Sequence, residues 1–421
     1  MKQYAMMDTT WGKFLFGVFL FAMLLLARDT LVTSCLIGFT KSQFLMLGLI
    51  CVFGLVFVIY NRKHWKQILL NQRMVAFGIS ALVLLVPMVG KRDWQIMYFS
   101  ILLCLFFAVF LTYLTSWQTV AKYYVVILAV LGLYSLVGMY LLKPQAMAGV
   151  VKAPVFVNST GMEFYNFGLT FVVTWEFWHR NFGIFREPGV YQFFLILGIY
   201  LNHYGVSWKR EWYRWLVTAV MMATMLSTFA IGGFIELGLL AVFLYFDKHY
   251  YRTKPGKILG TAVVAAMIAL VCHVISEIRK PYFEYTVYYE FYDMFRRLTT
   301  DSDSLVDRLD AIFTSMTLFF RHPLLGETIA NVLHGTTHNT SSTLILFSAL
   351  GIAGGVLHVA SWVSLTWKRE RNVFGNLFLL MILFMSFNTQ NLTADVFFWL
   401  FPYMALTEAL LPKLKLPGRK V

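Results

Sequence analysis

The stretch DRLDAIFTSMTLFFRHPLLGETIANVLHGTTHNTSS, residues 307–342, is the largest polar interruption in an otherwise apolar chain. It contains two arginines, three histidines and a tight PLLG turn at 323–326. An apolar run that starts near Thr343 follows it directly. We interpret this stretch as a loop that gathers reactive side chains, and the apolar remainder of the chain as the scaffold that holds it.

The composition predicts an all-α polytopic membrane protein. Of the 421 residues, 59% are hydrophobic and only 13% are charged, whereas about a quarter of a soluble domain is charged. The mean hydropathy is +0.67. Apolar runs of about 20 residues recur along the chain, and each is long enough to cross roughly 30 Å of hydrocarbon. We therefore expect a single integral membrane domain covering 1–421.

About twelve transmembrane helices are expected, and basic turns orient them. Lysine and arginine gather in turns such as NRKHWK, WKREWYR and WKRER, which the positive-inside rule places in the cytoplasm. An even number of spans then puts both termini in the cytoplasm. No small-residue cleavage site follows the first apolar run, so we expect that span to be retained. The predicted spans are 14–38, 43–60, 74–90, 95–114, 122–142, 190–205, 215–229, 231–246, 258–276, 342–366, 373–390 and 395–411.

The two longest connections, 143–189 and 277–341, are expected on the outer face. The second holds nine of the 21 carboxylates, so the acidic residues concentrate outside and the lysines inside. Within the first loop, 162–178 is apolar enough to form a half-span or an interfacial helix. No repeat and no separate soluble domain is apparent.

The net charge of +14 does not indicate a nucleic-acid partner, because the basic residues lie in short turns between spans. The four cysteines are scattered singly, which argues against a zinc site or a disulfide framework. No phosphate loop, nucleophile elbow, zinc-protease motif or dinucleotide fingerprint is present. We expect no metal and no cofactor, and a donor that reaches the outer face without a nucleotide would have to be carried on lipid.

The first candidate site residues are Arg186 and Glu187, which stand before Pro188 and Gly189 in FREPG. Proline is well tolerated at a helix start, and a helix N-terminus favours anions. Arg186 could clamp a phosphate with its planar fork. Equally, Arg186 and Glu187 could form an interfacial pair with no role in binding. The residues alone leave both interpretations open.

The second candidate is Arg308, at the start of an amphipathic helix expected to end at Arg321-His322-Pro323. About 20 Å would separate the two arginines along a straight helix, so they could not bind one small group. We interpret Arg321 as a solvated cation. Arg308 is either another solvated cation or a ligand for substrate.

The third candidate is His338, which lies just before a predicted span and is followed by Asn339. An imidazole there can take a proton near neutral pH, and Asn339 could hold a sugar hydroxyl. A lone histidine is nevertheless more often structural. His334 and His338 have a spacing that a metal accepts on a helix, but Gly335 argues against a helix there and no third ligand is evident.

Three motifs in this order resemble the bacterial O-antigen polymerase/ligase superfamily. They are FREPGVYQFFL, an arginine separated from PLLG by fourteen residues, and HNTSSTLILFSALGIAGG. The resemblance covers most of the chain. It implies a GT-C-type bundle with a long periplasmic loop in the bacterial plasma (cell inner) membrane. It also implies an inverting, metal-independent glycosyltransferase that uses undecaprenyl-diphosphate-linked oligosaccharides as donor and acceptor on the periplasmic face.

Residue by residue, the resemblance implies that Arg186 and Arg308 bind the diphosphate of the lipid donor. His338 would position or deprotonate the attacking sugar hydroxyl, and Glu187 would orient Arg186 or meet the acceptor sugar. Paired guanidiniums can answer the charge that develops on a leaving diphosphate without a metal. A chain-length regulator protein is a further partner that the resemblance leaves open.

Two alternatives stay open beside a repeat-unit polymerase. REPG resembles the polymerases more than the O-antigen ligases, which often carry a second glycine where Glu327 and Thr328 follow PLLG. A lipid-linked oligosaccharide flippase should keep ionisable residues inside its spans. Here most of the candidate charges stand at the outer span ends, with Glu236 as the clearest exception, and this favours an enzyme.

Overall fold

The computed structural model describes residues 9–60, 72–158, 161–175, 179–252, 303–334 and 341–410, with single residues between 254 and 276. The structure is mostly helical, at 75%, in agreement with the predicted class. The helices are α1 (Thr10–Leu25), η2 (Val32–Ile37), α2 (Phe39–Tyr60), α4 (Gln72–Gly90), α5 (Ile96–Leu114), α6 (Trp117–Val137), η4 (Gly138–Leu142), α7 (Lys143–Met147), α8 (Pro188–Tyr204), α9 (Glu211–Ser227), α10 (Ile231–Asp247), η5 (Tyr250–Arg252), α13 (Asp303–Arg321), α14 (Ile329–His334), α15 (Ser342–Thr366), α16 (Val373–Asn388) and α17 (Val396–Leu410).

Helices lie in eleven of the twelve predicted spans, and the segment 258–276 falls almost wholly outside the described residues. Within the described ranges, five helical segments are long and apolar enough to cross a membrane. Three shorter apolar helices, α1, α16 and α17, accompany them. The number of crossings and their direction remain predictions. The five segments are Phe39–Phe57, Arg73–Gly90, Ile96–Leu114, Trp117–Met147 and Ser342–Thr366.

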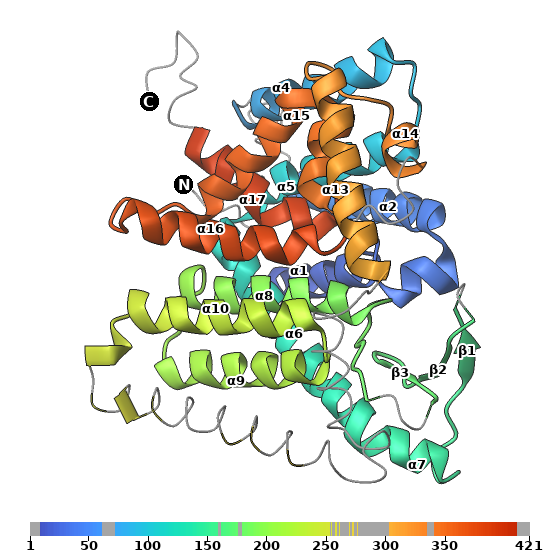
Figure 1. The fold of residues 1–421 in the computed structure, drawn as a ribbon, viewed down its shortest axis with the longest axis vertical. Coiled ribbons are helices and arrows are strands. Elements are labelled where there is room, and N and C mark those ends of the chain that lie inside the picture. The colour runs from blue at the N-terminus through green and yellow to red at the C-terminus, as the bar shows by residue number, and fades with distance from the viewer. Residues whose placement is uncertain are drawn as a thin grey trace.

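Helix α8 lies at the centre of the bundle. Fifteen of its residues are buried, from Pro188 to His203, because a helix that is apolar on every side is stable only when neighbours surround it. Its neighbours are α6, α9, α10 and α16, and Figure 1 shows α8, α9, α10 and α16 running alongside one another. We call the end at which α8 begins the site end of the bundle.

Helix α13 confirms the predicted amphipathic helix, since it ends at Arg321 as expected. It packs against α15 with Ala311 and Ser315 buried, whereas the apolar side chains of Phe313, Met316 and Phe320 are exposed. Figure 1 shows α13 lying across the direction of α8 and α10, on the same side of the view as α14 and the small sheet. The helix therefore packs on α15 at an angle to α8 and α10.

The expected first span 14–38 is wrong as a continuous helix. Helix α1 stops at Leu25, and the chain turns before the π-helical η2 begins at Val32. The Thr30 hydroxyl donates to the carbonyls of Leu25 and Ala27, at 2.7 and 3.1 Å, and so satisfies oxygens that the broken helix leaves open. The charged pair Arg28-Asp29 falls within this break.

The expected half-span or interfacial helix at 162–178 is also wrong. Three antiparallel strands form there instead: β1 (Val155–Val157), β2 (Glu163–Asn166) and β3 (Phe171–Val173), in the order β1-β2-β3. Buried Phe164 and Phe171 pack with Leu31 and Phe182 into a small core of their own. The apolar side chains that suggested a membrane helix thus fill this core.

The expected span 342–366 folds back on itself. Within α15, Gly351 has φ +67°, which breaks the helix into two arms. Thr343 Oγ1 lies 3.2 Å from His358 Nε2 across the arms, whereas fifteen residues of straight helix would separate them by about 22 Å. Gly355 leaves room for the Phe347 ring on the opposite arm. The last predicted loop therefore leads into a helical hairpin.

Candidate functional site

The first turn of α8 sets the candidate site. Glu187 occupies the N-cap position in an extended conformation, and Pro188 opens the helix, where its missing N–H costs nothing. A side chain at Gly189 would collide with Gln390, because its Cβ would lie 2.5 Å from Gln390 Nε2. The REPG sequence thus starts a helix and lets the α16–α17 connection approach that start.

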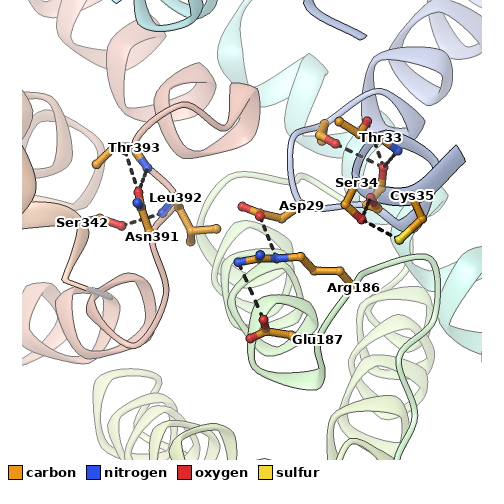
Figure 2. A network of polar contacts seen from close by, with 12 residues as sticks. Asp29, Thr33, Ser34, Cys35, Arg186, Glu187, Ser342, Asn391, Leu392 and Thr393 are labelled. Atoms are coloured by element: carbon orange, nitrogen blue, oxygen red, sulfur yellow. Dashed lines mark hydrogen bonds and ion pairs between the residues drawn. The ribbon is translucent and has the colours of Figure 1, made fainter. Parts of the chain in front are cut away.

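Arg186 is held by an aspartate that sequence analysis had not paired with it. Its Nε lies 3.0 Å from Asp29 Oδ1, while Nη2 lies 3.7 Å from Glu187 Oε1 (Figure 2). The Asp29 side chain is 4% exposed and that of Arg186 is 39% exposed. Burial opposes the charge of the guanidinium, but Asp29 and then Glu187 outweigh it and raise the pKa of Arg186. Arg186 is therefore a firmly charged group with an open side.

Backbone contacts fix this pair in place. Arg186 N donates to Asp29 O at 3.0 Å, and Leu31 N donates to Ile184 O at 2.8 Å. Thr30 and Phe185 form an antiparallel bridge between these contacts. The break after α1 and the residues before α8 thus pair like two short strands. The interruption of the first helix has a structural consequence: it carries Asp29 to Arg186.

Buried polar atoms without hydrogen-bond partners gather near this pair. Within the described ranges they include Arg28 Nη1, Asp29 Oδ2, Asp395 Oδ2 and Arg186 Nε itself, whose contact with Asp29 is an ion pair without hydrogen-bond geometry. Asp395 is fully buried and uses its other oxygen to cap α17, accepting from Phe397 N at 2.8 Å. Unsatisfied buried polar groups are costly and call for an explanation, such as a ligand or water.

His338 and Asn339 lie outside the described residues. The chain just after them, at Ser342, is described and contacts the α16–α17 connection. Ser342 Oγ donates to Gln390 O at 2.7 Å and accepts from Leu392 N at 2.8 Å. Gln390 in turn lies against Gly189 in the first turn of α8. Figure 2 shows the Ser342–Leu392 contact and the Asp29–Arg186 pair in one view. The segment that carries His338 thus ends beside the start of α8.

Arg308 lies on α13, and its side chain is outside the described residues. The helix itself is anchored to the first arm of α15, since Ser348 Oγ donates to Ser315 O at 2.8 Å. Arg308 precedes Ser315 by two helical turns, about 10 Å. The helix that carries Arg308 is therefore bound to the first arm of α15, which follows His338 in the chain. That Arg308 lies close to Arg186 remains a prediction.

The PLLG turn has a structural role. Gly326 has φ +71°, and its N donates to His322 O at 2.8 Å. Ile352 N donates to Pro323 O at 2.8 Å, which binds the turn to the fold-back of α15. A Cβ on Gly326 would lie 2.5 Å from the carbonyl carbon of Ala349. The turn is thus wedged into the apex of the α15 hairpin.

Sequence analysis missed Lys91, which also holds the PLLG turn against the apex of the α15 hairpin. We call this contact between 323–327 and the α15 apex the joint. Lys91 Nζ donates to Glu327 O at 2.5 Å and to Ala349 O at 2.6 Å. Burial lowers the pKa of Lys91 to about 8, although Asp93 and Glu327 favour its charged form. Asp93 Oδ2 accepts from Ile329 N at 2.6 Å, at the start of α14. Lys91 stands in the connection between the predicted spans 74–90 and 95–114, which the predicted topology places on the outer face, where lysines are few. Its position could therefore have marked it as unusual.

Comparisons with known protein families, with characterised proteins and with solved structures found no match for this chain.

The arrangement at the start of α8 is suited to binding an anion. Arg186 stands two residues before the first residue of α8, and a guanidinium and a helix N-terminus both attract phosphate oxygens. Asp29 neutralises part of the charge but is buried behind Arg186. Glu187 stands beside the open side at a distance too long for a hydrogen bond. An incoming phosphate could therefore bind the open nitrogens without first breaking a strong contact.

Proposed function

We propose that the protein is a membrane glycosyltransferase that polymerises oligosaccharide repeat units linked to undecaprenyl diphosphate. The product would be a surface polysaccharide, O-antigen or capsule, made at the outer face of the bacterial inner membrane. One observation carries this proposal: the chain leaving His338 is hydrogen-bonded to Gln390, whose side chain lies against Gly189, three residues after Arg186. An anion-binding cation and a candidate base would then serve one site.

The reach of the chain supports this. His338 is the third residue before Ser341, and a fully extended chain spans about 3.5 Å per residue. His338 therefore lies within about 10 Å of Ser341, whose Oγ donates to Asn388 Oδ1 at 2.9 Å. Asn388 also accepts from Thr343 N at 2.9 Å. This double anchor fixes where the polar loop enters α15.

The proposed reaction needs no metal. The acceptor hydroxyl oxygen forms a bond to the anomeric carbon of the donor sugar and loses its proton to His338. The bond from that carbon to the diphosphate breaks, and its electron pair stays on the leaving oxygen. Arg186 and Arg308 stabilise the charge that develops there. Glu187 and Asn339 contact the sugars.

A reconstituted reaction tests the proposal. The purified protein in liposomes, given a synthetic undecaprenyl-diphosphate repeat unit and EDTA, should produce a ladder of products that grow by one repeat unit. Lipid diphosphate should appear in step with the new glycosidic bonds. The complete absence of polymer under these conditions would refute the proposal. Deletion of the gene separates a polymerase from a ligase. Loss of a polymerase should leave surface glycan that carries a single repeat unit, whereas loss of a ligase should remove the surface glycan altogether.

One observation favours a second candidate, a transporter of the same lipid-linked sugar. Glu236 in α10 is fully buried, and both its carboxylate oxygens lack a hydrogen-bond partner among the described residues. Ionisable residues inside a membrane often mark transport pathways. A flippase would move the lipid-linked unit between leaflets without forming polymer, and Glu236→Gln would abolish that movement. The reconstituted assay therefore separates the two functions by their products.

A further inference from the structure

We infer that Asp29 is a positioning residue, which turns the Arg186 guanidinium so that its outer edge meets the diphosphate of the substrate. The inference rests on the proposed function and adds a residue from the first helix to it. Asp29 is too deeply buried to touch substrate itself, with only 4% of its side chain exposed. Its action would pass entirely through Arg186.

The geometry of the guanidinium supports this. Arginine presents its donors on two edges, one made by Nε with Nη2 and one made by Nη1 with Nη2. Asp29 Oδ1 lies 3.0 Å from Nε, whereas the nearest carboxylate to Nη2, that of Glu187, is 3.7 Å away. Among the described residues, no hydrogen bond engages the two Nη groups. The edge that matches two phosphate oxygens is thus the edge left open.

A second arginine–aspartate pair shows what a purely structural pair looks like here. At the opposite end of the bundle, Arg371 Nε lies 2.8 Å from Asp247 Oδ1 and its Nη2 donates to Asp247 Oδ2 at 3.4 Å. Arg371 Nη1 donates to Thr366 O at 3.3 Å, so every nitrogen is used. The Arg371 side chain is 7% exposed. Arg186 has an ion pair at the same nitrogen, although without the hydrogen bond that Arg371 Nε makes, and it differs in its open outer edge.

Asp29 is also held rigidly enough to act in this way. Its carbonyl accepts from Arg186 N, and the neighbouring Thr30–Phe185 bridge ties the two segments together. Thr30 is anchored in turn to the end of α1. A positioning group must hold its partner within a fraction of an ångström, because a small displacement of a catalytic group can cost a hundred-fold in rate. This double link between backbone and side chain meets that need.

The test is a double-mutant cycle in the reconstituted enzyme, with the wild type, Asp29→Asn, Arg186→Lys and the double variant. Donor and acceptor KM and kcat are measured separately, and Tm reports folding. We expect D29N to raise the donor KM about ten-fold and to leave the acceptor KM unchanged. In the R186K background D29N should add no further change, because lysine has no fork to orient. Asp247→Asn is the matched control, which should lower Tm and leave the donor KM unchanged.

The outcomes separate the two levels of the proposal. If the wild type makes polymer and D29N keeps a normal donor KM, the inference is overturned and the proposed function stands. Equal and additive effects of D29N in both backgrounds would show a structural role only, and would also overturn it. If D29N does not accumulate, Asp29→Glu takes its place in the cycle, and a normal donor KM there has the same meaning. A wild type without activity overturns both.

Discussion

The two motifs that stand out in the sequence, REPG at 186–189 and PLLG at 323–326, become two different kinds of structure. At PLLG, Gly326 N and Pro323 O are paired, and a side chain at Gly326 would collide with the backbone of Ala349. At REPG the helix start is also closely packed, but Arg186 keeps an open edge and buried polar atoms nearby lack partners.

This contrast separates support from function. A region whose polar groups are all satisfied contributes stability and specifies a unique fold. A region that keeps charge open at its surface gives up some of that stability, as binding sites commonly do. Variants in PLLG and its partners should therefore change how much protein folds. Variants around Arg186 should change turnover in protein that folds normally.

The largest effect is expected from Gly351→Ala at the apex of the α15 hairpin. An added Cβ would meet Leu324 O at 2.2 Å, and the residue has φ +67°, so the change combines a clash with backbone strain. We expect a loss of about 4 kcal/mol or more in unfolding free energy, seen as little monodisperse protein after extraction and a lowered Tm. Gly238→Ala in α10, where a Cβ meets nothing within 4 Å, is the control. A stable G351A protein would contradict the fold-back.

The second largest effect is expected at the REPG motif. Arg186→Ala removes the open guanidinium, and we expect kcat/KM for the lipid donor to fall by about 10²–10³-fold with near-normal extraction. Arg321→Ala, which removes an exposed arginine at the end of α13, should stay within about two-fold of the wild type. Equal losses in both variants would mean that surface charge in general, and not the α8 site, supports the reaction.

Apolar length was enough to locate the helices, but contacts distant in sequence decided where they break. The α15 hairpin depends on a turn 25 residues earlier that inserts at Gly351, and no local pattern announces it. The pairing of Asp29 with Arg186 joins positions 157 residues apart. Sequence analysis placed Arg186 at a helix start correctly, because proline and glycine mark that start locally. Nothing in the local sequence around Asp29 predicts that partner.

A smaller effect would sharpen the structural side of the comparison. Lys91→Met removes the donor shared by Glu327 O and Ala349 O and leaves two carbonyls at the joint unpaired. We expect the unfolding free energy to fall by about 2 kcal/mol, measured as a lower Tm. Turnover per folded molecule should remain normal. Lys13→Met, at an exposed position of α1, controls for the loss of a positive charge.

The smallest effect is a pH dependence at the same joint. The backbone N–H of Thr328 donates to Glu327 at 2.8 Å, and this contact, with smaller help from Asn331 and His322, lowers the pKa of Glu327 below 4.5. A carboxyl with a lowered folded-state pKa stabilises the fold above pH 4.5, and that stability is lost as the pH falls through its folded-state value. Because the group is near the surface, we expect only about half a kcal/mol.

Glu327→Gln isolates this contribution, since the amide oxygen can still accept from Thr328 while the charge is gone. The Tm of the wild type should exceed that of E327Q at pH 7, and the two should converge as the pH falls through the lowered folded-state pKa of Glu327. The same pH change should leave the ratio of R186A to wild-type turnover untouched, because Glu327 belongs to the joint and not to the α8 site. If that ratio followed the ionisation of Glu327, the two motifs would be one coupled unit, and the division between support and function would fail.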